Sequence, residues 1–420
     1  MKPVLDDYQW DAVERMKNGC ILCGGTGSGK SRTSIAYYFC KVCGGLIDGW
    51  YRGHEDSWLP MAEPTDLYII TTARKRDTMD WEKELILFHL PYDEGDGLVP
   101  KITVDSWNNI KKYTGVSGAF FIFDEQRVVG SGQWVKAFLK IAKQNRWILA
   151  SATPGDSWQD YIPVFIANGF YKNRTEFRAE HMLVQYHRNI PIRTEYIGTR
   201  KLKNLRDRIL VYMEDQRTTV RYTEILNCDY DAVRYKELVK NRWNEEEDRP
   251  ILSVSEFYFL LRKCVNSDPS RGKAILGLAK EHPKLLIFYN FNYELKILRA
   301  LPYPEGTEIR EWNGEKHETV PNSYRWVYLV QFSCVEGWNC TETDVCVFYS
   351  QNYSFKTMEQ ACGRIDRKNT PFRELYYYHL RSFAPIDIRI FRAIREKKKF
   401  NEREDFGKSG LKPFEDSASS

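Results

Sequence analysis

The chain has 420 residues, and its 62 Lys or Arg against 57 Asp or Glu give a formal net charge of +5. Hydrophobic residues make up 42% and charged residues 28%, which excludes a disordered chain, and no apolar run approaches the roughly 20 residues of a membrane helix. This charge is compatible with nucleic-acid binding but does not argue for it. The length suits two domains, and Met1 to Trp10 lack a secretory-signal pattern, so we expect a cytoplasmic protein.

Residues 1–155 alternate short apolar runs with helical patterns, which is typical of βαβ units around a parallel sheet. The predicted strands are Cys20–Cys23, Leu67–Thr71, Lys101–Val104, Ala119–Phe123 and Trp147–Ala150. Residues 44–64 form a long insertion between a helix and the next strand. The insertion holds Trp50, Tyr51 and Trp58. We interpret it as a segment folded onto the domain by its tryptophans, with nucleic-acid contact as the alternative.

Four cysteines in this region have the C-x2-C-x16-C-x2-C spacing of a zinc site: Cys20, Cys23, Cys40 and Cys43. The run from Gly19 to Cys23 leads directly into a glycine-rich loop and should therefore be a strand. Three residues of strand span ~10 Å and would place Cys20 and Cys23 on opposite sides of the sheet. Zinc–sulfur bonds of ~2.3 Å do not allow that separation, so we expect buried reduced thiols and no zinc.

The second half of the chain repeats the same alternation after an irregular stretch. Residues 156–230 are rich in Arg, Tyr and Thr, and we interpret them as a connector with some helix. A second α/β domain is predicted for residues 231–400, and the polar tail 401–420 is expected to be disordered. The helices of this second domain are predicted at Asp231–Trp243, Ser255–Asn266 and Asp387–Phe400, and its strands at Lys284–Tyr289, Trp326–Val330, Val345–Tyr349 and Leu375–His379.

The most specific motif runs from Gly24 to Ser31 and fits G-x-x-x-x-G-K-S/T at every position, after a strand and before a helix. Its glycines let backbone N–H groups turn toward phosphates, Lys30 reaches the β- and γ-phosphates, and the Ser31 hydroxyl binds Mg²⁺. The helix N-terminus adds a favourable dipole for the anion. The predicted ATP-binding residues are Gly24, Gly25, Thr26, Gly27, Ser28, Gly29, Lys30 and Ser31.

Two acids come directly after the apolar run Phe120–Phe123, at the end of the strand where a nucleotide site is expected. Asp124 is predicted to hold Mg²⁺ together with Ser31, and Glu125 to orient or deprotonate the attacking water. Alone, such a pair is weak evidence, because strand ends often carry acids. One strand later comes Ser151-Ala-Thr-Pro154, and the three motifs together have the order expected of one ATPase domain.

These motifs resemble those of superfamily-two helicases, and the Swi/Snf-like branch fits best. Leu5-x-x-Tyr8-Gln9 resembles the segment whose glutamine reads adenine. Thr71-Thr-Ala73, with Trp81-x-x-Glu84 after it, is similar to the segment that touches the nucleic-acid backbone. Asp124-Glu125-Gln126-Arg127 stands where the family has Asp-Glu-x-His or a variant. Arg127, in the fourth place, departs from that pattern.

The second domain carries a matching set of motifs. Leu261-Arg-Lys-Cys264, Lys273 and the strand Leu285–Tyr289 resemble the region around the fourth motif, and Ser333 with Glu336-Gly337-Trp-Asn339 resembles the fifth. Gln360-x-x-Gly363-Arg364-Ile-Asp-Arg367 matches the sixth motif, Q-x-x-G-R-x-x-R. Pro385-Ile-Asp387 before a basic helix is similar to the segment after the sixth motif in this branch, whereas Thr370 stands where a glutamine is usual. The likeness covers about residues 5–400.

The resemblance implies an α/β fold of two RecA-like parallel-sheet lobes, with the ATP site in the cleft between them. Its catalytic residues would be Lys30, Asp124, Glu125, Gln360, Arg364 and Arg367, and Gln9 and Gly337 would add to the ATP contacts. Ser151 and Thr153 would couple hydrolysis to lobe movement. The implied nucleic-acid contacts are Thr72, Ser106, Asn290 and Ser333.

A motor of this kind uses ATP and Mg²⁺, and its expected partner is double-stranded DNA in replication, recombination or remodelling. It should be active as a monomer, and a chain that is almost only motor resembles compact helicases often encoded by phages. An arginine supplied by the second lobe can raise the rate of phosphoryl transfer 10³- to 10⁵-fold, and it does so when the cleft closes. Two alternatives remain open: an RNA helicase with the same engine, and a non-catalytic binding module on a degenerate ATPase fold.

Overall fold

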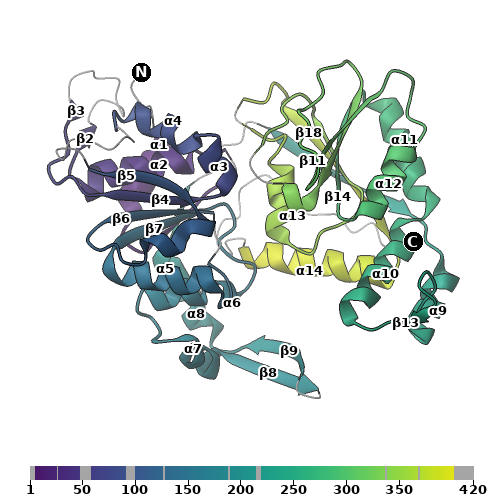
Figure 1. Ribbon diagram of the computed structural model, residues 1–420, viewed down its shortest axis with the longest axis horizontal. Coiled ribbons are helices and arrows are strands. Elements are labelled where there is room, and N and C mark those ends of the chain that lie inside the picture. Colours follow the sequence, from purple (N-terminus) through teal and green to yellow (C-terminus); the bar gives the residue numbers. More distant parts are fainter. Residues whose placement is uncertain are drawn as a thin grey trace.

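The computed structural model describes residues 5–25, 27–47, 58–90, 100–125, 128–187, 190–213, 219–335, 338–367 and 369–401, with the backbone alone at 58, 185–187, 190–194 and 398–401. Two α/β lobes lie side by side, each built around a six-stranded parallel sheet (Figure 1). The predicted fold class of two RecA-like lobes is therefore confirmed. No helix in the described part of the chain is long and apolar enough to cross a membrane.

The first sheet has the strand order β10-β1-β7-β6-β4-β5, and every pair in it is parallel. Its central strands are buried on both faces because helices pack on each side, as their continuous apolar sequences predict. The strands are β1 (Ile21–Cys23), β4 (Leu67–Thr71), β5 (Ile102–Ser106), β6 (Phe120–Asp124), β7 (Arg146–Ser151) and β10 (Leu210–Tyr212). The five strands predicted in residues 1–155 are all present.

Helices surround this sheet, and one of them continues directly from the glycine-rich motif. Helix α2 (Lys30–Tyr37) begins at the end of the glycine-rich loop and continues into the π-helix η1 (Tyr38–Val42). The other helical elements are α1 (Asp7–Arg15), α3 (Ala73–Asp77), α4 (Asp80–Leu87), the 3-10 helix η2 (Trp107–Tyr113), α5 (Gln133–Gln144), α6 (Trp158–Ala167), α7 (Arg174–His181) and α8 (Thr199–Ile209). A hairpin of β8 (Met182–His187) and β9 (Ile190–Tyr196) stands off the lobe (Figure 1).

The second sheet has the order β11-β18-β17-β14-β16-β15, again with every pair parallel. Its strands are β11 (Val220–Cys228), β14 (Lys284–Tyr289), β15 (Glu308–Trp312), β16 (Trp326–Gln331), β17 (Val345–Phe348) and β18 (Glu374–Ser382). Its helical elements are α9 (Ala232–Asn241), α10 (Val254–Asn266), α11 (Pro269–Glu281), α12 (Asn292–Ala300), the 3-10 helix η3 (Phe332–Cys334), α13 (Phe355–Cys362) and α14 (Pro385–Asn401). A short hairpin of β12 (Trp243–Asn244) and β13 (Arg249–Pro250) joins α9 to α10.

Residues 156–230, for which the sequence predicts an irregular connector, supply an edge strand to each sheet. Strand β10 pairs with β1 in the first sheet, and β11 pairs with β18 in the second. The sequence pattern hides both strands for a physical reason. Strand β10 has only three residues, and β11 is largely solvent-accessible, so neither produces the apolar run that marks a central strand.

The strand geometry expected around the cysteines is confirmed. Cys20 belongs to the core on one face of the first sheet, whereas Cys23 belongs to the core on the other face. Burial raises the pKa of the Cys20 thiol to about 12. Within the described ranges, no three His, Cys, Asp or Glu side chains gather as metal ligands.

The insertion at residues 44–64 is described in part. It contains the short antiparallel pair β2 (Leu46–Ile47) and β3 (Trp58–Leu59), and Ile47 is buried in the core of the first lobe. Trp50 and Tyr51 lie outside the described residues, as do Arg127 and the tail after residue 401. The aromatic anchoring of this insertion therefore stays a prediction.

Candidate nucleotide site between the two lobes

The glycine-rich loop connects β1 to α2 and has the backbone conformation that its glycines allow. Gly27 and Gly29 have φ values of 86° and 79°, in the left-handed region that other residues rarely adopt. A Cβ atom on Gly29 would lie 2.1 Å from Nε2 of Gln9, so a larger residue there would displace that side chain. Thr26 lies outside the described residues.

Lys30 points back over this loop. Its Nζ donates hydrogen bonds to the carbonyl oxygens of Gly24 and Gly25, at 2.9 and 2.8 Å. Burial lowers the pKa of the Lys30 ammonium, and the nearby Glu125 carboxylate opposes this effect. Ser31, in the first turn of α2, is partly exposed. The loop therefore holds its one cation beside its own backbone. A phosphate oxygen bound there would replace these carbonyl oxygens as the acceptor of the Lys30 hydrogen bonds.

Gln9 contacts the loop directly. Its Nε2 donates to the carbonyl oxygen of Ser28 at 3.0 Å, its Oε1 accepts from the backbone N–H of Asp6 at 2.9 Å, and the hydroxyl of Tyr8 also donates to Ser28 at 3.1 Å. The side chain is 3% exposed. The structure places the Gln9 amide against the phosphate loop, and the adenine-reading role of Gln9 stays a prediction.

The two acids stand at the end of β6. Oδ2 of Asp124 accepts hydrogen bonds from the Thr71 hydroxyl at 2.7 Å, the Lys75 ammonium at 2.8 Å and the Trp81 indole N–H at 3.2 Å, and the residue is 2% exposed. Three donors on one oxygen fix the carboxylate in a single orientation. The next residue, Glu125, has a φ of 62°, which is strained for a side chain with a Cβ atom.

Lys75 is a site residue that motif reasoning missed. Its Nζ lies 2.8 Å from Asp124 and 3.7 Å from Glu125. Burial alone would lower the pKa of Lys75, but the two carboxylates raise it above its ordinary value. Lys75 sits in α3, a helix that Thr72 caps by accepting the Lys75 backbone N–H at 3.3 Å. The run Arg74-Lys75-Arg76, directly after the Thr71-Thr-Ala73 motif, was the available signal.

The two arginines of the second lobe occupy different environments. Arg364 is 5% exposed and donates through Nε to the carbonyl oxygen of Gln360 at 3.0 Å and through Nη1 to that of Trp338. Arg367 instead reaches the first lobe, because a Cβ atom on Gly27 would lie 3.9 Å from its Cδ and Nη1 atoms. Nε of Arg367 is buried without a hydrogen-bond partner in the described structure. Burial lowers the pKa of Arg367 to about 10, against the charges of Asp366 and Glu125.

Three further contacts join the lobes. Lys356 of α13 lies 3.8 Å from Glu125, and Lys397 of α14 lies 3.5 Å from Asp156. The guanidinium of Arg74 in α3 lies over the ring of Trp312 in β15, 4.4 Å from its centroid. Glu125 is therefore approached by cations from both lobes, Lys75 and Lys356.

The predicted coupling residues lie next to the phosphate loop. Ser151 pairs with Cys23 in the register of β7 and β1, and its carbonyl oxygen accepts the Gly24 N–H at 3.3 Å. Its hydroxyl accepts the backbone N–H of Thr153 at 3.2 Å, and both residues are buried. A shift of the segment from Ser151 to Thr153 would therefore move Gly24 at the start of the phosphate loop.

The four predicted nucleic-acid contacts all lie at the carboxyl ends of strands, but they differ in accessibility. Ser333 is exposed, and Thr72 caps α3 and is partly exposed. Ser106 is buried, and its hydroxyl accepts from Nη1 of Arg76 at 3.4 Å. Asn290 donates to the hydroxyl of Ser350 at 2.8 Å and accepts from Asn352 at 2.9 Å. The structure therefore leaves Thr72 and Ser333 better placed for a ligand than the other two.

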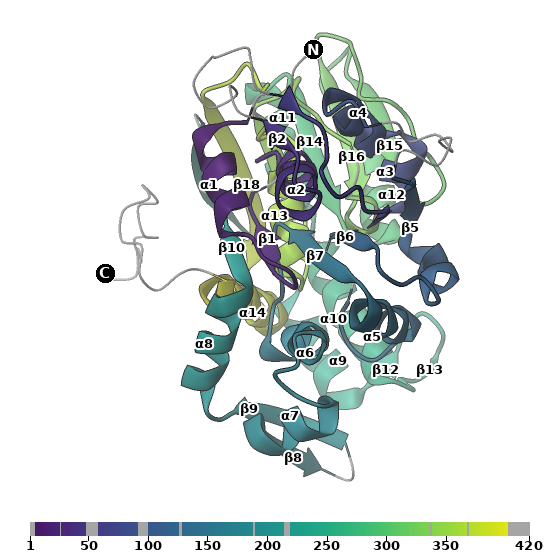
Figure 2. The same cartoon turned by 90° about the vertical axis from the view of Figure 1, so that its left-hand side faces the viewer.

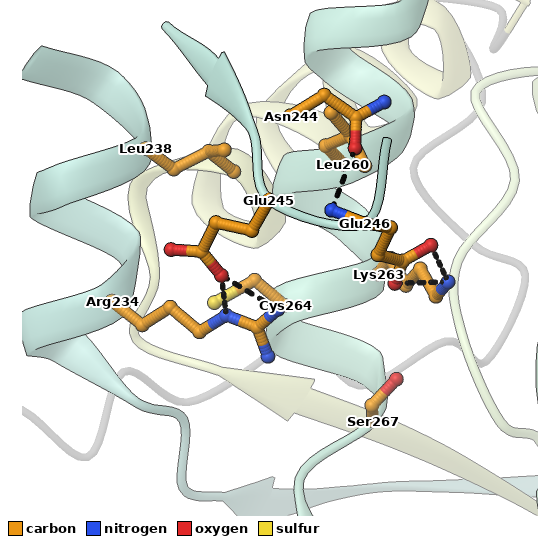
Figure 3. A pocket seen from close by; sticks show the side chains of 9 residues that line it. All are labelled: Arg234, Leu238, Asn244, Glu245, Glu246, Leu260, Lys263, Cys264 and Ser267. Atoms are coloured by element: carbon orange, nitrogen blue, oxygen red, sulfur yellow. Dashed lines mark hydrogen bonds and ion pairs between the residues drawn. The ribbon is translucent and has the colours of Figure 1, made fainter. Parts of the chain in front are cut away.

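A separate pocket in the second lobe contains none of the predicted site residues. It lies between α9 and α10 and is bordered by the turn that carries Glu245 and Glu246 (Figure 3). Arg234 pairs with Glu245 at 3.1 Å and Lys263 with Glu246 at 2.5 Å, so the main charges of the pocket are already matched.

Gly337 of the fifth motif lies outside the described residues.

Comparisons with known proteins add a likeness of fold. The chain is similar to the SWI2/SNF2 ATPase core of Sulfolobus solfataricus, solved in complex with dsDNA, with 16% identity and a TM-score of 0.42 over 96% of this chain and 92% of that one. No protein-family model and no curated protein matches the chain.

Proposed function

We propose that the protein is an ATP-dependent motor on nucleic acid, a duplex-DNA translocase or DNA helicase. The observation that carries this proposal is the meeting of two half-sites. The first lobe supplies Lys30, Asp124 and Glu125, while Arg367 of the second lobe extends to within contact range of Gly27 in the phosphate loop. Neither half by itself surrounds a γ-phosphate with positive charge.

The residues of the cleft fit a magnesium-bound nucleoside triphosphate. Gly27 and Gly29 have positive φ values, and Arg367 has a buried N–H group without a partner in the described structure. Lys30 and the loop N–H groups would hold the phosphates, and Ser31 and Asp124 would hold Mg²⁺, which neutralises phosphate charge when bound. Asp124 is buried and accepts three hydrogen bonds on one oxygen, so its carboxylate is already oriented for such a role.

Hydrolysis then depends on how this chain's side chains treat the attacking water. Glu125 would orient the water and accept its proton, while Lys30, Arg364 and Arg367 stabilise the negative charge that develops on the phosphoryl oxygens. Lys75 and Lys356 lie beside Glu125, one from each lobe. Movement of the second lobe therefore changes the electrostatic environment of the proposed base as well as the position of Arg367.

Duplex DNA is the partner that we propose, gripped through its phosphates by both lobes. Thr72 precedes the helix α3, whose Lys75 binds Asp124 and whose Arg74 stacks on Trp312. A backbone contact at Thr72 would thus act on a segment that touches both the acids and the second lobe. Because phosphates carry no sequence information, such a grip positions the protein on DNA without base specificity.

The proposal is tested by ATP turnover measured without nucleic acid and with duplex DNA, single-stranded DNA or duplex RNA. We expect duplex DNA to raise turnover, since a ligand that prefers the closed lobes shifts the population toward them. The stimulation should weaken as salt rises and should not depend on base sequence. Stimulation by RNA alone would favour an RNA helicase, and an absence of turnover in every condition would favour a non-catalytic module.

A further inference from the structure

A strongly basic segment lies outside the cleft. Residues 182–208 contain seven Lys or Arg and two Asp or Glu, a net charge of +5, which leaves 55 basic and 55 acidic residues in the rest of the chain. The segment comprises the β8–β9 hairpin and helix α8, here called the basic arm. Figures 1 and 2 show the hairpin projecting from the end of the first lobe. The net charge of this one segment thus equals the net charge of the whole protein.

The base of this arm is firmly anchored. Leu202 and Ile209 of α8 are buried in the same core as Phe177 of α7. The buried ring of His181 forms hydrogen bonds with the Tyr171 hydroxyl at 2.7 Å and with the carbonyl oxygen of Ile197 at 2.9 Å. Ile197 is the residue directly after the end of β9. The helix α8 therefore presents its outer face from a fixed position.

Some cations of α8 are neutralised locally, and others are not. Lys201 pairs with Glu180 at 2.6 Å, and Arg206 approaches Asp207 at 3.5 Å. Arg200 and Arg208 are exposed, and neither forms an ion pair or side-chain hydrogen bond with another residue that the structure describes. Arg200 and Lys201 also occupy the first helical turn, where cations oppose the helix dipole. Fold stability does not explain this placement.

We propose that the basic arm binds the phosphodiester backbone of duplex DNA, at a contact separate from the cleft residues Thr72 and Ser333. This inference rests on the proposed function and extends it. Arg200 and Arg208 are eight residues apart on α8, about 12 Å along the helix axis and about 80° around it. The major groove of a duplex is about 12 Å wide, a span equal to the axial separation of these two helix positions. A flexible single strand offers no such fixed spacing.

The arm is connected to the nucleotide site through the backbone. Helix α8 ends at Ile209, and β10 begins at the next residue. Strand β10 pairs with β1, and the N–H of Met213 donates to the carbonyl oxygen of Cys23 at 2.8 Å, immediately before Gly24 of the phosphate loop. DNA held by the arm is thereby attached to the lobe that holds the phosphates rather than to the moving second lobe.

The test compares the double variant Arg200→Gln/Arg208→Gln with the wild-type chain. Fluorescence anisotropy of a labelled duplex, measured over a series of salt concentrations, gives the affinity and its salt dependence. We expect weaker binding and a slope of log K against log salt that is smaller by about 0.9 for each phosphate that the variant no longer neutralises, so by about 2. ATP turnover without DNA and the melting temperature should stay unchanged, because neither arginine contacts the cleft or the core.

Lys136→Gln/Lys140→Gln on α5 is the matched control, since it removes two exposed cations from another face of the same lobe. This control should keep the wild-type slope. Equal loss in both variants would overturn the arm as a specific contact, as would a loss seen with duplex RNA but not with duplex DNA. If DNA stimulates ATP turnover by the wild type but the arm variant keeps the wild-type slope of log K against log salt, the arm proposal fails and the proposed function stands. If the wild type neither binds DNA nor responds to it, the proposed function fails with it.

Discussion

Asp124 and Arg367 are the clearest contrast between the two lobes. In the first lobe, one oxygen of Asp124 accepts three hydrogen bonds and the residue is buried. In the second lobe, Arg367 crosses toward Gly27 and retains a buried Nε without a partner in the described structure. The first lobe thus holds Asp124 in place through its own side chains, whereas the contribution of the second lobe depends on its position. Control of turnover is therefore expected to act through the second lobe.

Loss of the loop cation should have the largest effect. Lys30→Ala is expected to reduce DNA-stimulated ATP turnover to background, because no other side chain of the loop supplies positive charge to the phosphates. Its melting temperature should stay near that of the wild type, since Lys30 contacts loop carbonyls and not a hydrophobic core. Measurable turnover by a purified and folded Lys30→Ala protein would contradict this assignment.

The two arginines provide the sharpest test of the contrast. Arg367→Ala should lower turnover by about 10³- to 10⁵-fold with a modest loss of ATP affinity and an unchanged melting temperature. Arg364→Ala should lower turnover too, but it should also destabilise the lobe, because it removes buried hydrogen bonds to Gln360 and Trp338. Single-turnover kinetics and thermal melting separate the two results. Equal destabilisation by both variants would remove the distinction.

Glu125→Gln should stall the enzyme with nucleotide bound. The amide keeps the size of the side chain but cannot accept the proton of water, so turnover should fall by about 10²- to 10⁴-fold. A fluorescent ATP analogue should still bind with near-normal affinity. Near-normal turnover by this variant would show that another group is the general base.

Lys75→Met should have a smaller effect that reveals a positioning role. Without its ammonium group, Asp124 and Glu125 lack their shared cation, and kcat should fall by about tenfold, or roughly 1.4 kcal/mol, with little change in KM for ATP. The Thr71 and Trp81 contacts of Asp124 remain, so the melting temperature should change little. Lys75→Arg should restore most of the rate. If Lys75→Arg matched Lys75→Met, the role of this charge would be disproved.

Zinc should have no effect on this lobe. Elemental analysis of the purified protein should find no stoichiometric zinc, and a chelator should leave the melting temperature unchanged, because Cys20 and Cys23 lie on opposite faces of the sheet. One zinc ion per chain would contradict the strand geometry at this point.

The central strands and the motif residues could be predicted because their environments restrict the sequence strongly. A strand buried on both faces must be continuously apolar, as Phe120–Phe123 is, and a phosphate loop requires glycines and a lysine at fixed spacing. Edge strands such as β10 and β11 have no such constraint, so the interpretation of residues 156–230 as a connector missed them. Lys75 was missed because a lysine between two arginines in a short helix has the pattern of a solvated face.

Glu125 shows how this site differs from a fold selected for stability alone. Its left-handed backbone, at a φ of 62°, costs about 1–2 kcal/mol for a residue with a Cβ atom, and glycine would relieve that cost. A glycine would also remove the carboxylate. The most stable sequence and the most active sequence are therefore expected to differ at this position, which makes it a place where thermostability selection would erode catalysis.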